Sequence, residues 1–462
     1  MKKYHLLLLS ALSGLLFTLS WPMDGWAGFL FVAFVPLLLI EDYIDKNREE
    51  FHKFSVLTYT YPAFFIWNLL TTYWVMNSTL GGGIAAVVFN SLFMSVVFTV
   101  YHLTKRNLYT NHGYFVLIFY WISWEYFHMN WDLTWPWLNL GNGFASYHKW
   151  IQWYEYTGVL GGTFWVILVN ILIYRALFYS SIANRSRKKA LANAVAAFSL
   201  IAVPIIWSYI MYAHYEEEEH PVEIVVVQPN LDPYTEQYTV PPLEVIDRNL
   251  RLALKKIDSS TKFVVAPESA IQEDIWERKL NYSSSLRKLK RFVSGQPHLT
   301  VFIGASTFKQ FITGEELSPT ARKFKDHDAY YDAYNTVFMI DTAGIKQWYH
   351  KSKLTPGVER MPFPKYLKFL EGLAIDMGGT IGSLGIDEER KVFHTQYDSL
   401  KVAAIICYES VYGEFTAKFV RNGANLIFIV TNDGWWGNSP GHRQHFIYAR
   451  LRSIETRRSI AR

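Results

Sequence analysis

The stretch Val402-Ala-Ala-Ile-Ile-Cys-Tyr-Glu409 contains the only cysteine among the 462 residues of the chain. An apolar run of this kind, with several β-branched residues, is typical of a fully buried strand. Cys407 and Glu409 would then lie where the strand ends and a loop opens, which is where open α/β folds place their reactive groups. A lone cysteine after such a run is most often a small buried hydrophobic residue, so the interpretation depends on what lies upstream.

Two upstream segments end in side chains that a reactive cysteine would need. Lys262-Phe-Val-Val-Ala-Pro-Glu268 is a short apolar run that ends in a carboxylate, and Tyr349-His-Lys-Ser-Lys-Leu-Thr-Pro-Gly-Val-Glu359 follows a strand end with a lysine and a second glutamate. A thiol that attacks a carbonyl carbon needs a group to take its proton and a cation near the oxygen that becomes negative. Glu268, Lys351 and Cys407 are therefore the candidate base, cation and nucleophile.

The order of these three residues along the chain resembles the Glu-Lys-Cys triad of the nitrilase superfamily. Further segments narrow the resemblance to the apolipoprotein N-acyltransferases, the membrane-embedded members of that superfamily, over essentially the whole chain. Besides Cys407-Tyr-Glu409 and the segment from Lys351 to Glu359, these are Thr431-Asn-Asp-Gly-Trp-Trp-Gly437, Gly441-His-Arg-Gln-His445 and Ala449-Arg-Leu-Arg452.

The composition indicates a membrane protein. Half of the residues are hydrophobic, 17% are aromatic and only 18% are charged, which is apolar for a soluble chain of this length. The net charge of +5 is small and the basic residues are scattered, so we expect no nucleic-acid partner.

Apolar segments in the first half of the chain predict membrane helices. The basic start and leucine-rich core of residues 1–20 would also fit a cleaved signal peptide, but no clean Ala-x-Ala site follows and more apolar segments come next. We therefore expect seven spans, each near the length that a bilayer demands, at residues 4–21, 26–41, 54–76, 83–104, 113–130, 158–180 and 190–213.

Lysine and arginine in the connections predict the orientation of these spans. If the N-terminus is cytoplasmic, eleven of these residues fall on the cytoplasmic side, whereas the opposite short loops contain only Lys149. An odd number of spans then delivers everything after residue 213 to the outer face, which in a bacterium is the periplasm beside the inner membrane.

We expect a transmembrane helical domain at 1–213, an acidic juncture at 214–221 and a catalytic domain at 222–462. From Pro221 onward short β-branched runs alternate with amphipathic segments, which predicts an α/β sandwich. The resemblance implies the nitrilase αββα form and a catalytic domain truncated at its C-terminus, because the family continues beyond the position of Arg462. The predicted strands are 223–228, 263–266, 300–304, 334–341, 402–406 and 426–430, and the predicted helices are 243–257, 285–293 and 443–458.

Supporting roles follow from the same resemblance. It implies that Glu359, Tyr408 and Glu409 position the triad, although the family usually reads Val-Pro-Phe-Gly-Glu where this chain has Thr355-Pro-Gly-Val-Glu359. Lys351 is favoured over Lys353 because it follows the tyrosine at the family spacing.

Aromatic residues are candidates for contact with substrate or lipid. The family places a tryptophan in the loop after the first strand, where this chain offers Tyr234 or Tyr238. Trp137, Phe363 and Tyr366 are candidates for the lipid entrance, although an interfacial belt or a core cover would explain them equally well.

Within the predicted span at 113–130, Glu125 and His128 share a helix face and predict either a structural pair or a functional site. The family usually has arginine at the position of His128, so the pairing partner differs here.

The resemblance implies that the protein transfers a fatty acyl chain from a phospholipid to the N-terminal α-amino group of a diacylglyceryl apolipoprotein through a cysteine thioester. No cofactor is required, because the thioester retains the activation of the ester. A metal site is not expected either, because His442 and His445 lack a third ligand at metal-site spacing.

Two other functions stay open at this point. A membrane-tethered nitrilase-type amidase would use water in place of the amine. A seven-span receptor or transport component would not depend on Cys407 at all.

Overall fold

The computed structural model describes residues 2–108, 113–181, 186–363, 383–397 and 399–462. Within them the chain divides into two units, described separately here. The helical unit comprises Met1–Glu216 and Asn438–Glu455. The other unit comprises Glu217–Gly437 and Thr456–Arg462, and it is called the catalytic unit because it contains the three residues of the predicted triad.

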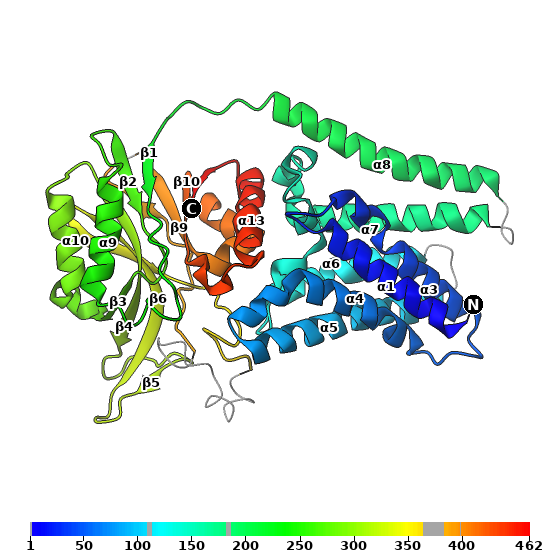
Figure 1. Ribbon diagram of the computed structural model, residues 1–462, viewed down its shortest axis with the longest axis horizontal. Coiled ribbons are helices and arrows are strands. Elements are labelled where there is room, and N and C mark those ends of the chain that lie inside the picture. The colour runs from blue at the N-terminus through cyan, green and yellow to red at the C-terminus, as the bar shows by residue number, and fades with distance from the viewer. Residues whose placement is uncertain (1, 109–112, 182–185, 364–382, 398) are drawn as a thin grey trace. The chain divides into compact units, whose positions relative to one another are not determined.

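Each of the seven predicted spans overlaps a helical segment of the helical unit (Figure 1). Among the described residues, five helical segments are long and apolar enough to cross a membrane. The number of spans stays a prediction, because α6 has 13 residues and a bilayer needs about 20. The helices are α1 (Lys3–Ser20), α2 (Leu30–Ala33), α3 (Val35–Lys46), α4 (Ser55–Thr72), α5 (Leu80–Leu108), α6 (Val116–His128), α7 (Tyr154–Ser180) and α8 (Arg187–Ala213).

A glycine and a pair of aromatic rings determine how α1 packs on α4. A Cβ added at Gly14 would lie 2.6 Å from the carbonyl oxygen of Ala63, so only glycine allows this approach. One turn on, Phe17 stacks on Trp67 with ring centroids 4.5 Å apart. The close backbone approach and the ring pair together fix how α1 lies on α4.

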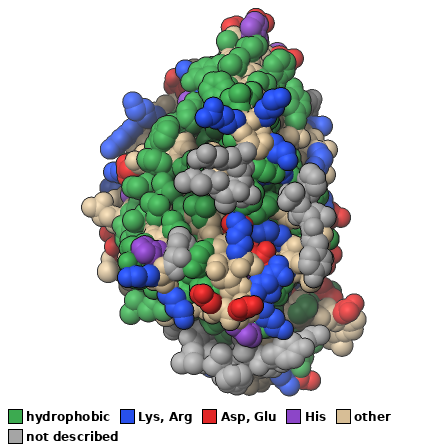
Figure 2. Space-filling view, turned by 90° about the vertical axis from the view of Figure 1, so that its right-hand side faces the viewer, with side chains coloured by type: hydrophobic (Ala, Val, Ile, Leu, Met, Phe, Trp, Pro, Cys, Tyr) green, Lys and Arg blue, Asp and Glu red, His purple; other side chains and the backbone are tan. Residues whose placement is uncertain are grey.

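Basic side chains gather at one end of this unit, as Figure 2 shows. Lys46 lies in the last turn of α3, Lys105 and Arg106 lie in the last turn of α5, and α8 begins at Arg187. These are the side chains that the orientation argument assigns to the cytoplasmic face.

Glu125 and His128 have different hydrogen-bond partners, so the structure does not bear out the predicted pair. The Glu125 carboxylate accepts hydrogen bonds from Leu140 N at 2.9 Å and Thr163 Oγ1 at 2.6 Å. His128 Nδ1 accepts from the indole of Trp131, so its Nε2 carries the proton and donates to Asn90 Oδ1 at 2.7 Å. The two side chains thus hold α6 to different neighbours.

Helix α13 (Gly441–Thr456) belongs with this unit for most of its length, although it follows the catalytic strands in the sequence. Trp74 Nε1 donates to Gln444 Oε1 at 2.9 Å, and the Tyr448 hydroxyl donates to the carbonyl oxygen of Trp137 at 2.7 Å. The domain boundaries given by the sequence stay a prediction.

The catalytic unit contains two sheets (Figure 1). Among the described residues the larger sheet has seven strands, in which β1, β2, β4, β6 and β5 are successive neighbours while β3 pairs with β4 and β7 pairs with β6. Its strands are β1 (Glu223–Val226), β2 (Thr261–Val265), β3 (Ile271–Trp276), β4 (Thr300–Gln310), β5 (Arg322–Lys323), β6 (Tyr330–Asp341) and β7 (Gly344–His350).

The smaller sheet has the order β11-β10-β9-β8. Strands β9, β10 and β11 run parallel, and β8 is antiparallel to β9. The bounds are β8 (Phe393–His394), β9 (Lys401–Ile406), β10 (Leu426–Val430) and β11 (Ser459–Ala461).

The two sheets face each other through aromatic side chains. Phe428 of β10 lies edge-on to Phe263 and Phe302 of the larger sheet, with centroid separations of 5.4 and 5.0 Å. Helices α9 (Pro242–Leu254) and α10 (Ser284–Ser294) bury apolar residues against the other face of the larger sheet, and α12 (Gly413–Arg421) packs beside β9. The predicted αββα sandwich is confirmed.

Candidate active site

Three strand ends supply the predicted triad. Glu268 lies three residues after the end of β2, Lys351 directly follows β7, and Cys407 directly follows β9. The strand β7 is antiparallel to β6, and the backbone N–H of Lys351 donates to the carbonyl oxygen of Asn335 on β6 at 2.8 Å. The larger sheet thus fixes the position of Lys351.

A glycine allows the close approach that positions Glu268. A Cβ added at Gly304 of β4 would lie 2.6 Å from the Cα of Glu268 and 2.8 Å from the carbonyl oxygen of Pro267. Gly304 N also donates to that carbonyl at 3.1 Å. Any side chain at position 304 would therefore push the glutamate away from the sheet.

Lys351 lies between two glutamates in a buried cluster. Its Nζ is 3.0 Å from Glu268 Oε1 and 2.9 Å from Glu359 Oε1. Asn335 Nδ2 donates to the same two oxygens at 2.8 and 3.0 Å. Lys351 is 2% exposed and Glu268 is 6% exposed, so water does not screen these charges.

The charges of this cluster shift the pKa values of its members. Burial by itself would lower the pKa of Lys351, but Glu268 and Glu359 outweigh it and hold that pKa well above its usual value. Burial would raise the pKa of Glu359, whereas Lys351 and the backbone N–H of Thr355 lower it. The lysine is therefore a cation and Glu359 an anion at neutral pH.

Cys407 begins the short helix η10 (Cys407–Val411) with a left-handed backbone, φ 49°. A non-glycine residue in this conformation is strained, which is common at functional positions. The thiol is 8% exposed, and burial raises its pKa well above the ordinary value, with Glu268 raising it further and Lys351 opposing. The sulfur is protonated at neutral pH and needs a base before it can attack.

Glu409 fastens the Cys407 strand end to the Lys351 loop. One carboxylate oxygen accepts hydrogen bonds from the Tyr349 hydroxyl at 2.7 Å and from Ser352 N at 2.6 Å. The other accepts from Ile406 N at 2.8 Å. A fully buried carboxylate with these donors orders both segments at once.

The loop after β1 reaches the cluster through Tyr238. Burial raises the pKa of Tyr238 to about 12, and the negative charges of Glu268 and Glu359 add to the shift. Tyr234 instead is exposed, and its hydroxyl donates to the carbonyl oxygen of Trp435 at 3.0 Å. Of the two candidates, Tyr238 is the one near the charged cluster.

Two polar neighbours of the cluster come from the loop after β10. Thr431 forms a hydrogen bond with the Cys407 thiol, and the backbone N–H of Asn432 lies 3.4 Å from Glu268 Oε2. Neither these residues nor Asn335 stood out in the sequence. Only the motif Thr431-Asn-Asp-Gly-Trp-Trp-Gly437, used there to identify the family, marked this loop.

The remaining candidates lie in different places. Tyr408 is buried beside Tyr412, with ring centroids 5.2 Å apart. Trp137 is 3% exposed in the helical unit and lies edge-on to Trp74 at 5.0 Å. Phe363 is half-buried in the catalytic unit with φ 49°, and Tyr366 lies outside the described residues. Their roles at a lipid entrance stay predictions.

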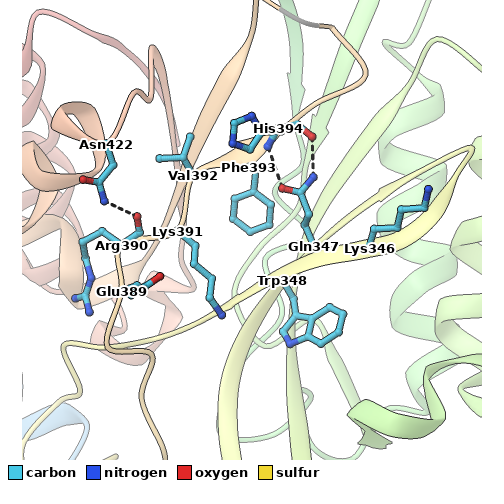
Figure 3. Close-up of a pocket in the computed structure, with 10 residues that line it drawn as sticks. All are labelled: Lys346, Gln347, Trp348, Glu389, Arg390, Lys391, Val392, Phe393, His394 and Asn422. Atoms are coloured by element: carbon cyan, nitrogen blue, oxygen red, sulfur yellow. Dashed lines mark hydrogen bonds between the residues drawn. The ribbon is translucent and has the colours of Figure 1, made fainter.

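A surface groove of about 480 Å³ lies elsewhere in the catalytic unit (Figure 3). Its walls include Gln347 and His394, which are joined by two hydrogen bonds of 2.7 and 2.9 Å. None of the residues that line it belongs to the charged cluster. Among the described residues no group of three or more His, Cys, Asp or Glu is arranged to hold a metal ion.

The cluster brings together the chemistry of acyl transfer. It places a protonated thiol close to a carboxylate that can accept its proton and to an ammonium that can stabilise an oxyanion. Its exclusion from water strengthens each of these interactions.

Comparisons with known proteins agree with this chemistry. Residues 13–172 match the family model of the apolipoprotein N-acyltransferase N-terminal domain, and residues 301–458 match that of carbon-nitrogen hydrolase. An apolipoprotein N-acyltransferase of Chlorobaculum tepidum is 31% identical over 98% of this chain and 84% of its own length. One from Thermotoga maritima is 26% identical over 98% of this chain and 80% of its own length.

Among solved structures, Saccharomyces cerevisiae Nit3, a member of branch 10 of the nitrilase superfamily, aligns with 52% of this chain and 73% of its own, at 16% identity and a TM-score of 0.35. The family assignment rests on the sequence relatives, whose similarity runs through both units. The chain therefore belongs to the apolipoprotein N-acyltransferase family.

Proposed function

We propose that this N-acyltransferase moves a fatty acyl chain from a membrane phospholipid to the α-amino group of the diacylglyceryl-cysteine at the N-terminus of an apolipoprotein. The observation that carries the proposal is the contact of Lys351 Nζ with Glu268 and Glu359, 3.0 and 2.9 Å away in a buried site. Two of these charged groups, Glu268 and Lys351, also shift the pKa of Cys407. The family to which the chain belongs supports the choice of acceptor.

In the first half of the reaction, Glu268 takes the proton of the Cys407 thiol while the sulfur attacks the ester carbonyl carbon of the phospholipid. Lys351 and backbone N–H groups at the start of η10 stabilise the negative tetrahedral oxygen. The intermediate collapses when the C–O bond of the ester breaks and Glu268 returns the proton to the leaving alkoxide. A lysophospholipid departs, and a thioester remains on Cys407.

In the second half, the free α-amine of the acceptor attacks the thioester carbonyl. Glu268 takes a proton from the attacking nitrogen, the C–S bond breaks, and the proton passes to the sulfur as the amide forms. Cys407 is thereby regenerated as a thiol. The acyl group stays on Cys407 between the two halves, and the lysophospholipid leaves before the amine reacts, which is a ping-pong mechanism.

Glu359 and Glu409 have supporting roles in this scheme. Glu359 shares Lys351 and Asn335 with Glu268, so it holds the ammonium and the amide in place. Glu409 joins the nucleophile segment to the lysine segment through three backbone N–H donors and one hydroxyl donor. Tyr408 lies beside the nucleophile and lines the same buried region.

The catalytic unit would act on the periplasmic side of a bacterial inner membrane. The supporting observation is the excess of lysine and arginine in the connections at one end of the helical unit. A phosphatase reporter that is active only outside the cytoplasm should be active when fused after residue 216 and inactive when fused after residue 108. The opposite result would reverse the assignment.

Intact-mass analysis after incubation with phospholipid tests the mechanism. We expect a mass increase of one fatty acyl group on the full chain, which disappears when a diacylglyceryl lipopeptide with a free amine is added. Cys407→Ser should show no hydroxylamine-sensitive adduct. A protein that gains no mass, or one that cleaves a small soluble amide without forming an adduct from phospholipid, would exclude the acyl-transfer mechanism.

A further inference from the structure

His350 is a buried side chain next to Lys351 that the mechanism above does not use. It is the last residue of β7 and is 6% exposed. Its Nε2 lies 2.8 Å from Glu277 Oε1, and its Nδ1 lies 3.1 Å from Asp387 Oδ1. The ring stacks on Tyr334 with centroids 4.0 Å apart.

These contacts define the protonation state of the ring. An ionised carboxylate has no hydrogen to donate, so each imidazole nitrogen that contacts one must itself carry a proton. His350 contacts a carboxylate through each nitrogen and is therefore an imidazolium. A neutral ring would leave one nitrogen lone pair facing a carboxylate oxygen in a buried site, which is unfavourable.

The imidazolium joins two segments that flank the catalytic lysine. On one side Glu277 begins η8 (Glu277–Tyr282) after strand β3. On the other, Asp387 accepts a hydrogen bond from the backbone N–H of His350 at 3.0 Å, and its carbonyl oxygen accepts one from Ser352 Oγ at 2.6 Å. The residues immediately before and after Lys351 are thus both bonded to Asp387.

The same segment also reaches the second glutamate of the cluster. Three residues before Asp387, Leu384 N donates to the carbonyl oxygen of Glu359 at 2.9 Å. The described segment 383–387 therefore contacts the backbone N–H before Lys351, the Ser352 hydroxyl after it, and the backbone of Glu359.

We propose that His350 is a positioning residue for Lys351, in which the imidazolium holds Glu277 and Asp387 together and so fixes the backbone from which the lysine reaches Glu268 and the oxyanion. The inference rests on the proposed function, because acyl transfer is the reaction that this positioning would make faster. Loss of the imidazolium charge would leave two largely buried carboxylates on either side of an uncharged residue next to the lysine, and their repulsion would move the segments apart.

Other charged and titratable groups around the ring are consistent with this role. Lys391, which also lines the groove of Figure 3, contacts the second oxygen of Asp387 at 2.9 Å. The Tyr334 hydroxyl donates to Asp332 Oδ2 at 3.2 Å, and burial followed by the charge of Asp332 raises the pKa of this phenol. Thr307 Oγ1 donates to Glu277 Oε1 at 3.2 Å. None of these groups replaces the cation that lies between the two carboxylates.

The direction of the pH effect follows from the charge. Burial by itself would lower the pKa of His350, but the hydrogen bonds to Asp387 and Glu277 outweigh it and raise that pKa above the ordinary value. A group with a raised pKa in the folded state stabilises the fold below its unfolded pKa of about 6.5, and this stabilisation is lost as the pH rises through the folded value. The positioning effect should therefore weaken on the alkaline side.

The test compares His350→Gln with a matched control, His394→Gln, in the full chain. His394 is exposed on β8, and its backbone rather than its ring pairs with Gln347. The rate of Cys407 acylation by a phospholipid in detergent micelles should fall by about 10²-fold in His350→Gln, with little change in KM, because a displacement of roughly 1 Å can cost that much. The control should retain the wild-type rate.

A double variant separates charge from packing. Replacing Asp387 by asparagine in the His350→Gln background removes one of the two facing carboxylates. We expect the double variant to be acylated roughly tenfold faster than His350→Gln, a coupling typical of residues in direct contact. A double variant no faster than the single variant would contradict the charge argument.

Nitrogen NMR of ring-labelled histidine supplies a readout that does not depend on activity. We would subtract the spectrum of a His350 variant from that of wild type near pH 7.5, about one unit above the ordinary histidine pKa. The remaining signals should be those of a ring with both nitrogens protonated. Should His350→Gln fail to fold, the double variant supplies both the NMR assignment of His350 and the acylation rate. A neutral ring, or acylation within about twofold of wild type in a folded His350→Gln, would overturn the inference, whereas the absence of any thioester in wild type would overturn the proposed function alone.

Discussion

Each unit of the chain buries a lysine against a carboxylate, and the two clusters differ in their balance of charge. In the helical unit, Glu41 of α3 contacts Lys105 through one oxygen and His102 through the other, at 2.7 Å from His102 Nδ1. In the catalytic unit, one lysine faces two carboxylates, Glu268 and Glu359. The first cluster pairs its charges, and the second has a carboxylate in excess.

This difference separates a structural ion pair from a site that can move a proton. The helical cluster holds α3 to α5, and neither of its carboxylate oxygens is left over for chemistry. In the catalytic cluster, ionising the thiol in place would add a further negative charge, which agrees with the raised pKa of Cys407, caused first by burial and then by Glu268. In the proposed mechanism, the proton of the thiol is passed to the excess carboxylate as the sulfur attacks.

Removing the nucleophile should have the largest effect on activity. Cys407→Ala should lower acyl transfer to a lipopeptide by roughly a thousandfold or more, because the covalent route is lost. The thiol is small and buried at the end of β9, so thermal unfolding of the variant should remain close to that of wild type. Substantial transfer activity in this variant would mean that the catalytic cluster serves another purpose.

Removing the excess carboxylate should lower activity and raise thiol reactivity at once. Glu268→Gln should slow acyl transfer by about 10²- to 10⁴-fold, the usual contribution of a general base. Glu268 also raises the pKa of Cys407, so the variant should react faster than wild type with a thiolate-selective alkylating agent, because a larger fraction of the thiol is then ionised.

Glu359→Gln is the matched control for that alkylation experiment. Glu359 contacts the same lysine but is not among the main causes of the raised pKa of Cys407. Its alkylation rate should therefore stay near that of wild type. Slower alkylation of Glu268→Gln than of Glu359→Gln would contradict the assignment of Glu268 as the base.

The sequence predicted the strand ends that carry Glu268 and Cys407, because each follows a buried apolar run. Residues 402–406 and 426–430 were predicted as strands, and the structure has β9 at Lys401–Ile406 and β10 at Leu426–Val430. Strand β3 was missed because Ile271–Trp276 contains three polar residues and is held by its pairing with β4.

Neighbours of the triad that come from strand pairing could not be predicted. Asn335 lies within β6 and resembles any strand residue, but the antiparallel register with β7 brings it beside Lys351. His350 was visible only as the residue before the lysine, because Glu277 and Asp387 are 73 and 37 residues away in the chain. In the same way, the packing of α13 on Trp74 depends on contacts between residues 370 positions apart.

The helical cluster should affect stability and not the chemical step. Glu41→Gln leaves Lys105 buried without its carboxylate, which should destabilise the fold by about 3 kcal/mol. Thermal unfolding in detergent micelles measures the loss, and acyl transfer per folded molecule should be unchanged. Adding Lys105→Met should restore much of the stability, because no buried charge is then left unpaired. A fall in the acylation rate of the folded variant would give this cluster a catalytic role.

An exposed pair on the same helix should have the smallest effect. Lys46 contacts Asp42 at 2.6 Å across one turn of α3, and its side chain is 54% exposed. Its Nζ also lies 4.7 Å from the ring centroid of Phe178, yet Lys46→Gln should cost less than about 1 kcal/mol in total, because water screens exposed charges. Salt should weaken this contribution further, whereas the buried pair of Glu41 and Lys105 should be much less sensitive to salt. Since both pairs join a lysine to an acidic side chain of α3, a larger loss for Lys46→Gln than for Glu41→Gln would mean that burial does not set the strength of these clusters.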